Sequence, residues 1–374
     1  MHLALVPAPS PGGDHPRPEF PCVNVQFPRT PGSLNAPLIV HRHLRWDFVW
    51  QRPQQLLSRL SEWADVLFVE EPIYVDDVAD PRLDVSKPMA NVCRVAPMLP
   101  ASMRASYDQS AMVTCELPRR EMAADGLFDD RYDRPIQWFY TPMAAPAMLG
   151  AFGEIAVVYD CMDELSQFRF APAELIDREK LLISEADVVF AGGVKLARAK
   201  SQLHANVHFF GCGVDSAHFA SAMDAALAIP HDVADITGSV VGYYGVIDER
   251  IDYVLLRELA AAVPDVSLIM IGPVVKVAPS ELPQAPNILW LGQRSYADLP
   301  AYVRRLDVCL MPFALNDATE FINPTKTLEY MAAGKPVVST VISDVVRQFP
   351  ERVRLRRRGG GHARAALGHG EAAL

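Results

Sequence analysis

The sequence lacks several features that would place the protein in a specialised class. No apolar run approaches the roughly 20 residues that a transmembrane helix needs, and no basic start followed by an apolar core indicates a signal peptide. The net charge of −10 argues against general nucleic-acid binding. The six cysteines are scattered without a close pair, which argues against a zinc site or a disulfide framework and favours a reducing compartment. We therefore expect a cytoplasmic protein without a resident metal or cofactor.

What is present is a long, half-apolar chain. Its 374 residues are enough for two domains with separate hydrophobic cores. Residues 1–36 are rich in proline and glycine and predict a disordered extension. We expect a first domain over 37–210, a linker over 211–238, a second domain over 239–350 and an atypical basic, glycine-rich tail over 351–374.

Apolar segments of strand length alternate with helical patterns in both domains. We expect strands at 38–40, 65–70, 91–96, 136–140, 156–159, 187–191, 239–244, 266–272, 288–291, 307–311 and 336–340. Helices are expected near Pro53 and over 173–186, 194–203 and 299–306. This alternation predicts an α/β fold with parallel sheets, in which ligands bind beyond the carboxyl ends of the strands.

The stretch from Leu306 to Thr340 reads as strand, polar loop, helix and strand. Asn323 suits the helix N-cap and Pro324 the first helical position, while Gly334 suits the residue after the helix. The first turn would then offer the N–H groups of Thr325 and Lys326 to an anion, and Glu329 lies one turn further. The alternative is a well-capped surface helix with an ordinary Lys326–Glu329 pair.

Two groups of polar residues follow strands in the first domain. The loop before Pro53 is basic and aromatic and includes Arg45, Trp46 and Arg52. It would hold an anionic ligand such as a phosphate, or else bury its tryptophans and solvate its arginines. The segment Asp160–Glu164 places three carboxylates at a strand end, where Asp163 or Asp160 would position a substrate hydroxyl or stabilise a developing positive charge. The alternative is helix capping and solvation.

In the second domain, Gly245 follows a predicted strand, so its bare backbone could approach a phosphate closely. Arg250 is a candidate phosphate clamp or a solvated arginine at a helix start. Lys276 follows another strand and could also reach a phosphate. Gln293 follows the strand at 288–291.

These segments resemble GT-B glycosyltransferases of family 4. The resemblance spans roughly residues 38–350 and is closest to a subgroup with "WDFVWQRPQQLL" and "YDCMDE" segments. The family motif "LEAMA-G-PVV" is matched by Leu328, Glu329, Tyr330, Met331, Ala332, Gly334, Pro336, Val337 and Val338. The family resemblance implies two doubly wound Rossmann-like domains facing a cleft, and a retaining transfer from a nucleotide diphosphate sugar without a metal ion.

The resemblance also implies roles for individual residues. Glu329 would hold the ribose, and the backbone around Gln293 would contact the base. The departing diphosphate would be stabilised by Arg250, Lys276, Thr325 and Lys326, beside Gly245. The acceptor would be a glycan or a lipid-linked sugar of cell-surface polysaccharide synthesis, bound near Arg45, Trp46, Arg52, Asp160 and Asp163.

Departures from the family pattern keep other functions open. The position of a second family glutamate is Phe321, and the family's catalytic histidine has no counterpart in the "YDCMDE" segment. A sugar-nucleotide epimerase of the same fold and a non-catalytic nucleotide-sugar-binding protein are therefore alternatives. From Leu355 onward the sequence rises in arginine and glycine, which indicates either a truncated or altered C-terminus or a basic tail for the inner face of a membrane.

Overall fold

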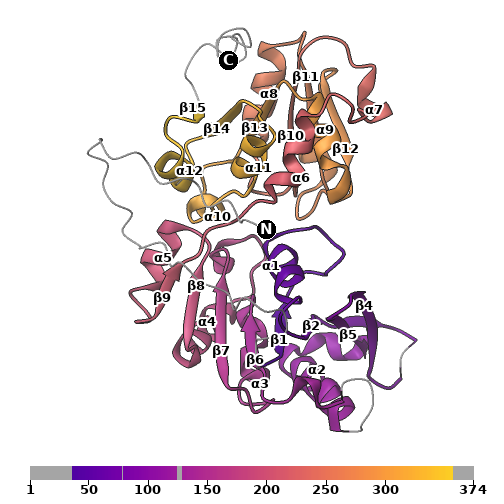
Figure 1. Ribbon diagram of the computed structural model, residues 1–374, viewed down its shortest axis with the longest axis vertical. Coiled ribbons are helices and arrows are strands. Elements are labelled where there is room, and N and C mark those ends of the chain that lie inside the picture. Colours follow the sequence, from indigo (N-terminus) through magenta and orange to yellow (C-terminus); the bar gives the residue numbers. More distant parts are fainter. Residues whose placement is uncertain (1–35, 78, 124–128, 357–374) are drawn as a thin grey trace. The chain divides into compact units, whose positions relative to one another are not determined.

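A computed structural model describes residues 36–77, 79–123 and 129–356 (Figure 1). These residues form two compact units that divide between Gly211 and Cys212. The predicted extension over 1–36 lies outside the described residues, apart from its last residue, as does the tail after Arg356. No helix in the described part of the chain is long and apolar enough to cross a membrane.

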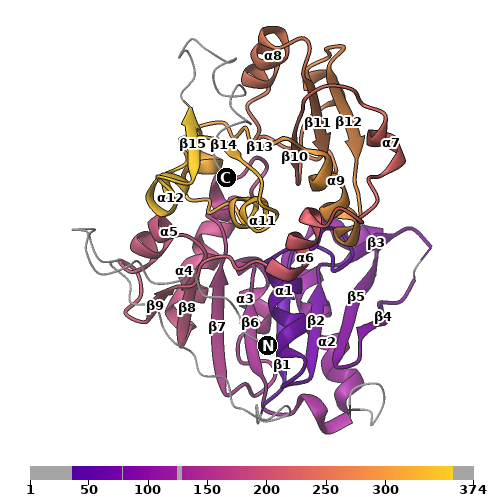
Figure 2. The same cartoon turned by 45° about the horizontal axis from the view of Figure 1, so that its top comes forward.

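The N-terminal unit contains a nine-stranded sheet (Figure 2). Eight of its strands lie in the order β3-β5-β2-β1-β6-β7-β8-β9, and their pairs are parallel, while β4 pairs antiparallel with β5. The strands are β1 (Leu38–Arg42), β2 (Val66–Glu70), β3 (Ile73–Val75), β4 (Arg82–Met89), β5 (Val92–Pro100), β6 (Ile136–Phe139), β7 (Ala156–Cys161), β8 (Val188–Ala191) and β9 (Val207–Phe209). The helices are α1 (Arg52–Leu60), α2 (Tyr107–Ala123), α3 (Ala145–Met148), α4 (Leu175–Glu185) and α5 (Val194–Lys200).

The start of α1 shows why the loop before it has a fixed path. The Gln51 backbone N–H donates to the Gln54 side chain, which closes the first turn, and Pro53 lies in that turn. Leu57 and Leu60 then point into the core. Because both glutamines also bind Arg42 at the end of β1, the helix start is tied to the carboxyl edge of the sheet.

The C-terminal unit contains a six-stranded, entirely parallel sheet in the order β12-β11-β10-β13-β14-β15. Its strands are β10 (Val240–Tyr244), β11 (Ser267–Ile271), β12 (Ile288–Gly292), β13 (Val308–Met311), β14 (Val337–Thr340) and β15 (Val353–Arg356). Its helices are α6 (Ser216–Ala220), α7 (His231–Ala234), α8 (Tyr253–Ala262), α9 (Leu299–Arg305), α10 (Asp317–Glu320), α11 (Lys326–Ala332) and α12 (Ser343–Gln348).

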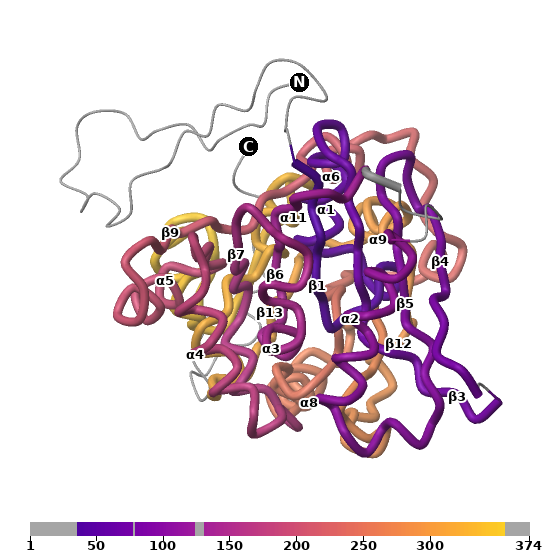
Figure 3. The backbone as a smooth tube through the Cα atoms, turned by 90° about the horizontal axis from the view of Figure 1, so that it is seen from below, coloured from indigo at the N-terminus to yellow at the C-terminus, as the bar shows by residue number. Residues whose placement is uncertain are grey.

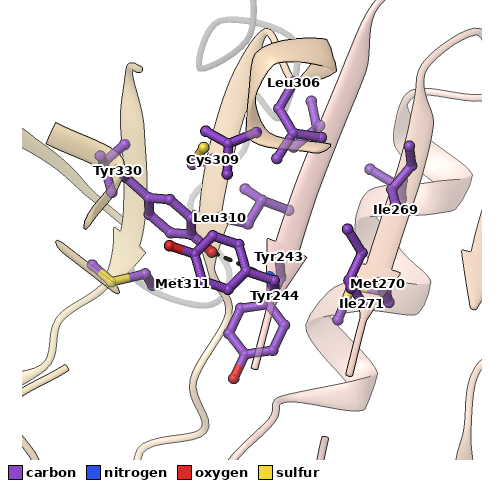
Figure 4. Close-up of a cluster of buried hydrophobic side chains, with 14 of the residues drawn as sticks. Tyr243, Tyr244, Ile269, Met270, Ile271, Leu306, Cys309, Leu310, Met311 and Tyr330 are labelled. Carbon is purple, nitrogen blue, oxygen red and sulfur yellow. Dashed lines mark hydrogen bonds between the residues drawn. The ribbon is translucent and has the colours of Figure 1, made fainter. Parts of the chain in front are cut away.

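Each unit has its own hydrophobic core. In the C-terminal unit, Tyr243 and Tyr244 of β10 pack beside Tyr330 of α11 (Figure 4). The Tyr330 hydroxyl accepts a hydrogen bond from the backbone N–H of Tyr244 at 3.3 Å, which satisfies a polar atom inside the core. This contact fixes α11 against the strand that the candidate site follows.

Every strand predicted from the sequence is present, and the largest difference is that β5 continues to Pro100. Four strands and one long helix were missed: β3, β4, β9, β15 and α2. The edge strand β4 runs beside β5 (Figure 3), and its side chains are mostly exposed, so no apolar period marks it. Helix α2 carries Pro118 in its interior, a residue that normally ends a helix.

Two predictions about the C-terminal unit were wrong. The helix around Glu329 begins at Lys326, with Thr325 rather than Asn323 in the N-cap position, so Asn323 and Pro324 precede it. The loop at 316–322 contains the short helix α10, which Asn316 caps by accepting from the backbone N–H of Thr319.

The sheet also continues past residue 350, where the sequence predicted the second domain to end. β15 pairs in parallel with β14 over four residues, and Val353 is buried. Val353 and Leu355 alternate with arginines, which is the period of a strand with one buried face. The arginine-rich composition hid this short pattern.

Candidate functional site

A cluster of residues at the carboxyl end of β10, which we call the donor cluster, brings together Tyr244, Gly245, Lys326 and Glu329. Gly245 has a φ of 141°, a conformation that L side chains rarely adopt. A Cβ at this position would overlap the Cε atom of Lys326, so the Lys326 side chain lies directly against the Gly245 backbone. The absence of a side chain at residue 245 is what makes room for this lysine.

Glu329 lies one turn after Lys326 on α11 and is only 9% exposed. Its Oε2 atom accepts a hydrogen bond from the Tyr244 hydroxyl at 2.7 Å. Burial raises the pKa of Glu329, and the Lys326 charge and the Tyr244 hydrogen bond oppose that shift. Tyr244 therefore holds the carboxylate that was predicted to bind ribose.

The Lys326 ammonium lies 5.8 Å from the centre of the Tyr243 ring, within range of a cation–π contact. Burial lowers the pKa of Lys326, Glu329 raises it, and Arg250 lowers it further. Asp248 also raises the pKa of Lys326, so acidic groups and one guanidinium act on this lysine in opposite directions. A bound anion would add the negative charge that favours its ammonium form.

The backbone around Gly245 is packed against the loop after β11. Gly272 has a φ of 145°, and a Cβ there would overlap the carbonyl oxygen of Gly245. The Gly272 N–H donates to the Gly292 carbonyl at 2.9 Å, which ties in the end of β12. The carboxyl ends of the adjacent strands β10, β11 and β12 are therefore closely packed. Gln293 is exposed just after β12.

The other predicted phosphate contacts have acidic partners. Arg250 binds both carboxylate oxygens of Asp248, with a shortest distance of 2.7 Å. Lys276 has a φ of 61° and lies 3.9 Å from Glu249. The structure places Arg250 near enough to Lys326 to lower the pKa of its ammonium. The side chain of Thr325 makes no capping hydrogen bond.

In the N-terminal unit, the three carboxylates of the "YDCMDE" segment have different environments. Asp160 is fully buried and forms an ion pair with Arg52 at 2.8 Å. The same guanidinium donates to the backbone carbonyls of Phe210 and Gly211. The pair joins a predicted catalytic residue to a predicted acceptor-side residue in a buried structural contact, which leaves neither exposed to a ligand.

Glu164 is held in a second buried network. Its carboxylate binds the Lys200 ammonium at 2.8 Å, and Lys200 binds Glu179 at the same distance. Glu179 also accepts from the Tyr159 hydroxyl at 2.6 Å. These contacts raise the pKa of Lys200, despite its burial, and anchor the loop after β7 to α4 and α5. Glu164 is thus a structural residue of this loop.

Asp163 lines a pocket. This Asp163 pocket is also lined by Arg42, His43, Gln51 and Tyr140, at the carboxyl ends of β1, β6 and β7. The Arg42 guanidinium is held by the side chains of Gln51 and Gln54 at 2.8 and 2.9 Å. Of the two predicted catalytic carboxylates, Asp163 is the one that a substrate could reach from this pocket.

The predicted acceptor-side residues Arg45 and Trp46 are placed mainly by structural contacts. Arg45 binds Glu70 at 3.0 Å and the carbonyls of Glu71 and Pro72, although its side chain remains partly exposed. Trp46 is buried in the core, where its ring packs edge-on to Phe68 at 5.1 Å. For Trp46 the structure favours the alternative reading of a buried tryptophan.

Sequence reasoning missed several residues of these sites. Tyr244 was read only as the last residue of a strand, although a tyrosine beside the predicted phosphate-binding glycine was a signal for a polar partner. The residues of α2 that lie near the carboxyl ends of β1 and β2 were also missed, because the sequence did not predict this helix. Among the described residues, no group of three or more His, Cys, Asp or Glu side chains is placed to hold a metal ion.

Comparison with known proteins bears on the second unit most directly. Residues 238–358 match the protein family described as "Glycosyl transferases group 1". The matched region covers about a third of the chain. It contains β10, α11 and the whole donor cluster.

One curated relative is TuaH of Bacillus subtilis (strain 168), named as a glycosyltransferase of teichuronic acid biosynthesis. It is 27% identical over 224 residues, and the match covers 54% of this chain and 54% of the relative. The chain therefore aligns with about half the length of that protein.

Solved structures resemble the chain over most of its length. An Escherichia coli structure described as trehalose-6-phosphate bound with UDP-2-fluoro glucose has a TM-score of 0.63 at 13% identity, covering 89% of this chain and 90% of that one. Sucrose-phosphate synthase from Thermosynechococcus elongatus has a TM-score of 0.62 at 16% identity, covering 88% of each chain. These likenesses establish the GT-B fold expected from the sequence.

Proposed function

We propose that the protein is a retaining glycosyltransferase of family 4 type. It would transfer a sugar from a nucleotide diphosphate sugar to a glycan or lipid-linked acceptor in cell-surface polysaccharide synthesis. The observation that carries this proposal is the donor cluster, in which the Lys326 side chain lies against Gly245 and the buried Glu329 carboxylate binds the hydroxyl of the adjacent Tyr244. The family match over the same residues and the name of the Bacillus relative support it.

The donor cluster fits two parts of a nucleotide diphosphate sugar, the charged diphosphate and the ribose. The Lys326 ammonium would bind the diphosphate and stabilise its charge as the sugar leaves, with Gly245 allowing the phosphate to approach. The Glu329 carboxylate, oriented by Tyr244, would accept hydrogen bonds from the ribose hydroxyls. Arg250, Lys276, Thr325 and Gln293 would complete the donor contacts once a ligand competes for their present partners.

Because lysine supplies the positive charge in this arrangement, no divalent ion is required in the proposal. The acceptor would bind the N-terminal unit, with Asp163 positioned to orient its hydroxyl or stabilise the developing positive charge on the sugar. We place the enzyme in the cytoplasm, with peripheral contact to the inner face of the membrane where a lipid-linked acceptor resides.

Calorimetric titration of UDP and GDP tests the donor cluster. A hydrogen bond to a charged group contributes about 1.5–3 kcal/mol, so Glu329→Ala should weaken nucleotide binding about ten- to a hundredfold. Glu329→Gln should give an intermediate affinity. Glu258→Ala, which removes an exposed glutamate from α8, is the matched control and should bind as the wild type does. Equal affinities for wild type and Glu329→Ala would refute the donor-site assignment.

Product analysis separates the possible activities. Incubation with a panel of UDP-, GDP- and ADP-sugars and glycan acceptors should give transfer with the anomeric configuration of the donor, read by NMR, and the rate should persist in excess EDTA. Conversion of the donor sugar alone would indicate an epimerase, and nucleotide-sugar binding without turnover would indicate a binding protein. Complete loss in EDTA, restored by Mn²⁺ or Mg²⁺, would contradict the metal-independent mechanism.

A further inference from the structure

A second pocket in the N-terminal unit, which we call the α2 pocket, lies between the carboxyl ends of β1 and β2 and the first turns of α2. It is lined by His41 and Arg42 from β1, by Glu71 after β2, and by Tyr107, Ser110 and Thr114 from α2, among others. In a parallel sheet this edge is where ligands bind. The pocket is small, with room for roughly one or two hydroxyl groups or waters.

His41 presents an acceptor atom that makes no hydrogen bond in the described part of the chain. The Gln137 amide nitrogen donates to the Met148 carbonyl at 2.6 Å, so the Gln137 oxygen faces the His41 Nε2 atom, also at 2.6 Å. His41 must therefore carry its proton on Nε2, which leaves Nδ1 as a hydrogen-bond acceptor. That Nδ1 atom is buried and unpartnered, and burial lowers the pKa of His41 to about 4, so the ring is neutral.

Two further polar atoms among the pocket-lining residues are buried without a partner within the described residues. They are the Thr114 hydroxyl and the Arg42 Nε–H, and both residues are at least nine-tenths buried. Leaving such a group unsatisfied costs about 1–3 kcal/mol, so a partner is expected. Ser110, which lines the same pocket, differs because its hydroxyl already donates to the Met103 carbonyl at 2.9 Å.

The chemistry of the pocket matches hydroxyl groups better than charged ones. His41 offers an acceptor, Arg42 a donor and Thr114 both, and a hydroxyl can donate and accept at once. An anionic ligand would meet the carboxyl groups of Glu70 and Glu71 at the ends of the neighbouring strand. Burial raises the pKa of Glu71 to about 7, which keeps much of this carboxyl neutral and able to donate as well.

We propose that the α2 pocket is a subsite for a neutral, polyhydroxylated ligand, taking the hydroxyl edge of a sugar ring of the acceptor. Arg42 lines both this pocket and the Asp163 pocket, so a sugar bound here would adjoin the carboxylate predicted to act in transfer. The role as an acceptor subsite rests on the proposed function, whereas the binding of sugar hydroxyls does not.

Direct binding to the full-length protein tests the subsite without any donor. The probes are methyl α-D-glucopyranoside, methyl N-acetyl-α-D-glucosaminide and, as the anionic comparison, glucuronate, each titrated at millimolar concentrations with the threonine methyl groups followed by NMR. At least one neutral probe should shift the Thr114 signal. Thr114→Val, which keeps the shape and removes the hydroxyl, should weaken its binding about two- to tenfold.

Ser110→Ala is the matched control, because it removes a hydroxyl from the same pocket that is already partnered, and it should bind the probe like the wild type. If Thr114→Val fails to fold, Thr114→Ala serves as the second variant, because it removes the same hydroxyl and should weaken binding in the same direction. No binding of either neutral probe, tighter binding of glucuronate, or equal losses in Thr114→Val and Ser110→Ala would each overturn the proposal.

UDP titration of the same samples tests the proposed function separately from the sugar subsite in the α2 pocket. Failure of nucleotide binding in the wild type would count against the proposed function, while sugar binding sensitive to Thr114 would still support the subsite.

Discussion

At the scale of residues, the three carboxylates that follow β7 have different structural roles although they are close in the sequence. Asp160, Asp163 and Glu164 follow one strand, yet one forms a buried ion pair, one lines a pocket and one anchors a loop. The sequence could indicate that carboxylates gather at a strand end. It could not assign their roles, because Arg52 and Lys200 are brought to them by the fold and not by sequence proximity.

This division of roles predicts different effects of two substitutions. Asp160→Ala leaves the Arg52 charge buried without its partner, which should lower the free energy of unfolding by about 3–5 kcal/mol. Asp163→Ala should change stability by less than about 1 kcal/mol and should instead reduce transfer. Urea unfolding and sugar-transfer assays on both variants measure this contrast. Similar stability losses in the two would show that Asp163 is also structural.

The buried carboxyl of Glu71 predicts a pH effect on stability. Its pKa is raised to about 7 by burial, whereas an unfolded glutamate ionises near 4.5. The folded state therefore holds this proton more tightly, and the stability it contributes is lost as pH rises from about 4.5 through 7. The glutamine in Glu71→Gln is uncharged at every pH in this range, so the variant should not lose this stability as the pH rises.

Thermal unfolding of wild type and Glu71→Gln across this range measures the effect. The melting temperature of the variant minus that of the wild type should increase as the pH rises. His41, with its pKa lowered to about 4, acts in the opposite direction, but it is present in both proteins and cancels in the difference. A difference that stays constant with pH would mean that Glu71 ionises normally in the folded protein.

At the scale of elements, periodic and buried strands were predictable and irregular or exposed elements were not. The central strands were predictable because each is a continuous apolar run. In contrast, α2 contains a proline, β4 is exposed and β9 has only three residues, so local sequence carried little signal for them. The donor cluster could be predicted in part because Gly245 and Lys326 each mark a strand or helix end, while the Tyr244–Glu329 hydrogen bond depends on packing across the unit.

The last strand gives a test at this scale. β15 buries Val353, packs Leu355 against the core and completes the edge of the second sheet. A chain ending at Glu351 should therefore be less stable than one ending at Arg356, by several kcal/mol, since fully burying one aliphatic side chain contributes about 1.5–3 kcal/mol. Urea unfolding of the two chains makes the comparison, and coincident curves would show that β15 adds nothing to the fold.

At the scale of the whole molecule, the described chain consists of two units with separate cores, and each contains its own candidate sites. Every residue of the donor cluster lies after Cys212, and both pockets lie before Gly211. This arrangement predicts that nucleotide recognition belongs to one unit. The presence of two units was predictable because the alternation of strands and helices restarts near residue 239. The predicted boundaries of the linker at 211 and 238 remain predictions.

Separate expression of residues 36–211 and 212–356 tests this division. The second fragment should bind UDP with nearly the affinity of the full chain, and the first should not bind it. Calorimetry gives the affinities, and circular dichroism shows whether each fragment is folded. A folded second fragment that fails to bind UDP would mean that residues before Gly211 are required for nucleotide recognition.

The contact between Gly245 and Gly272 has a consequence for how the gene can change. Every missense change of one base in a glycine codon introduces a residue with a Cβ, and at either position that atom would overlap a neighbour, the Gly245 carbonyl in one case and Lys326 in the other. At Gly272 the overlap is with backbone, so relief would require the two loops to move together, whereas at Gly245 the Lys326 side chain would have to move and the φ of 141° disfavours any side chain. In a library of random variants selected for function, these two codons should therefore accumulate only silent changes, while the codon of the exposed Glu258 drifts freely.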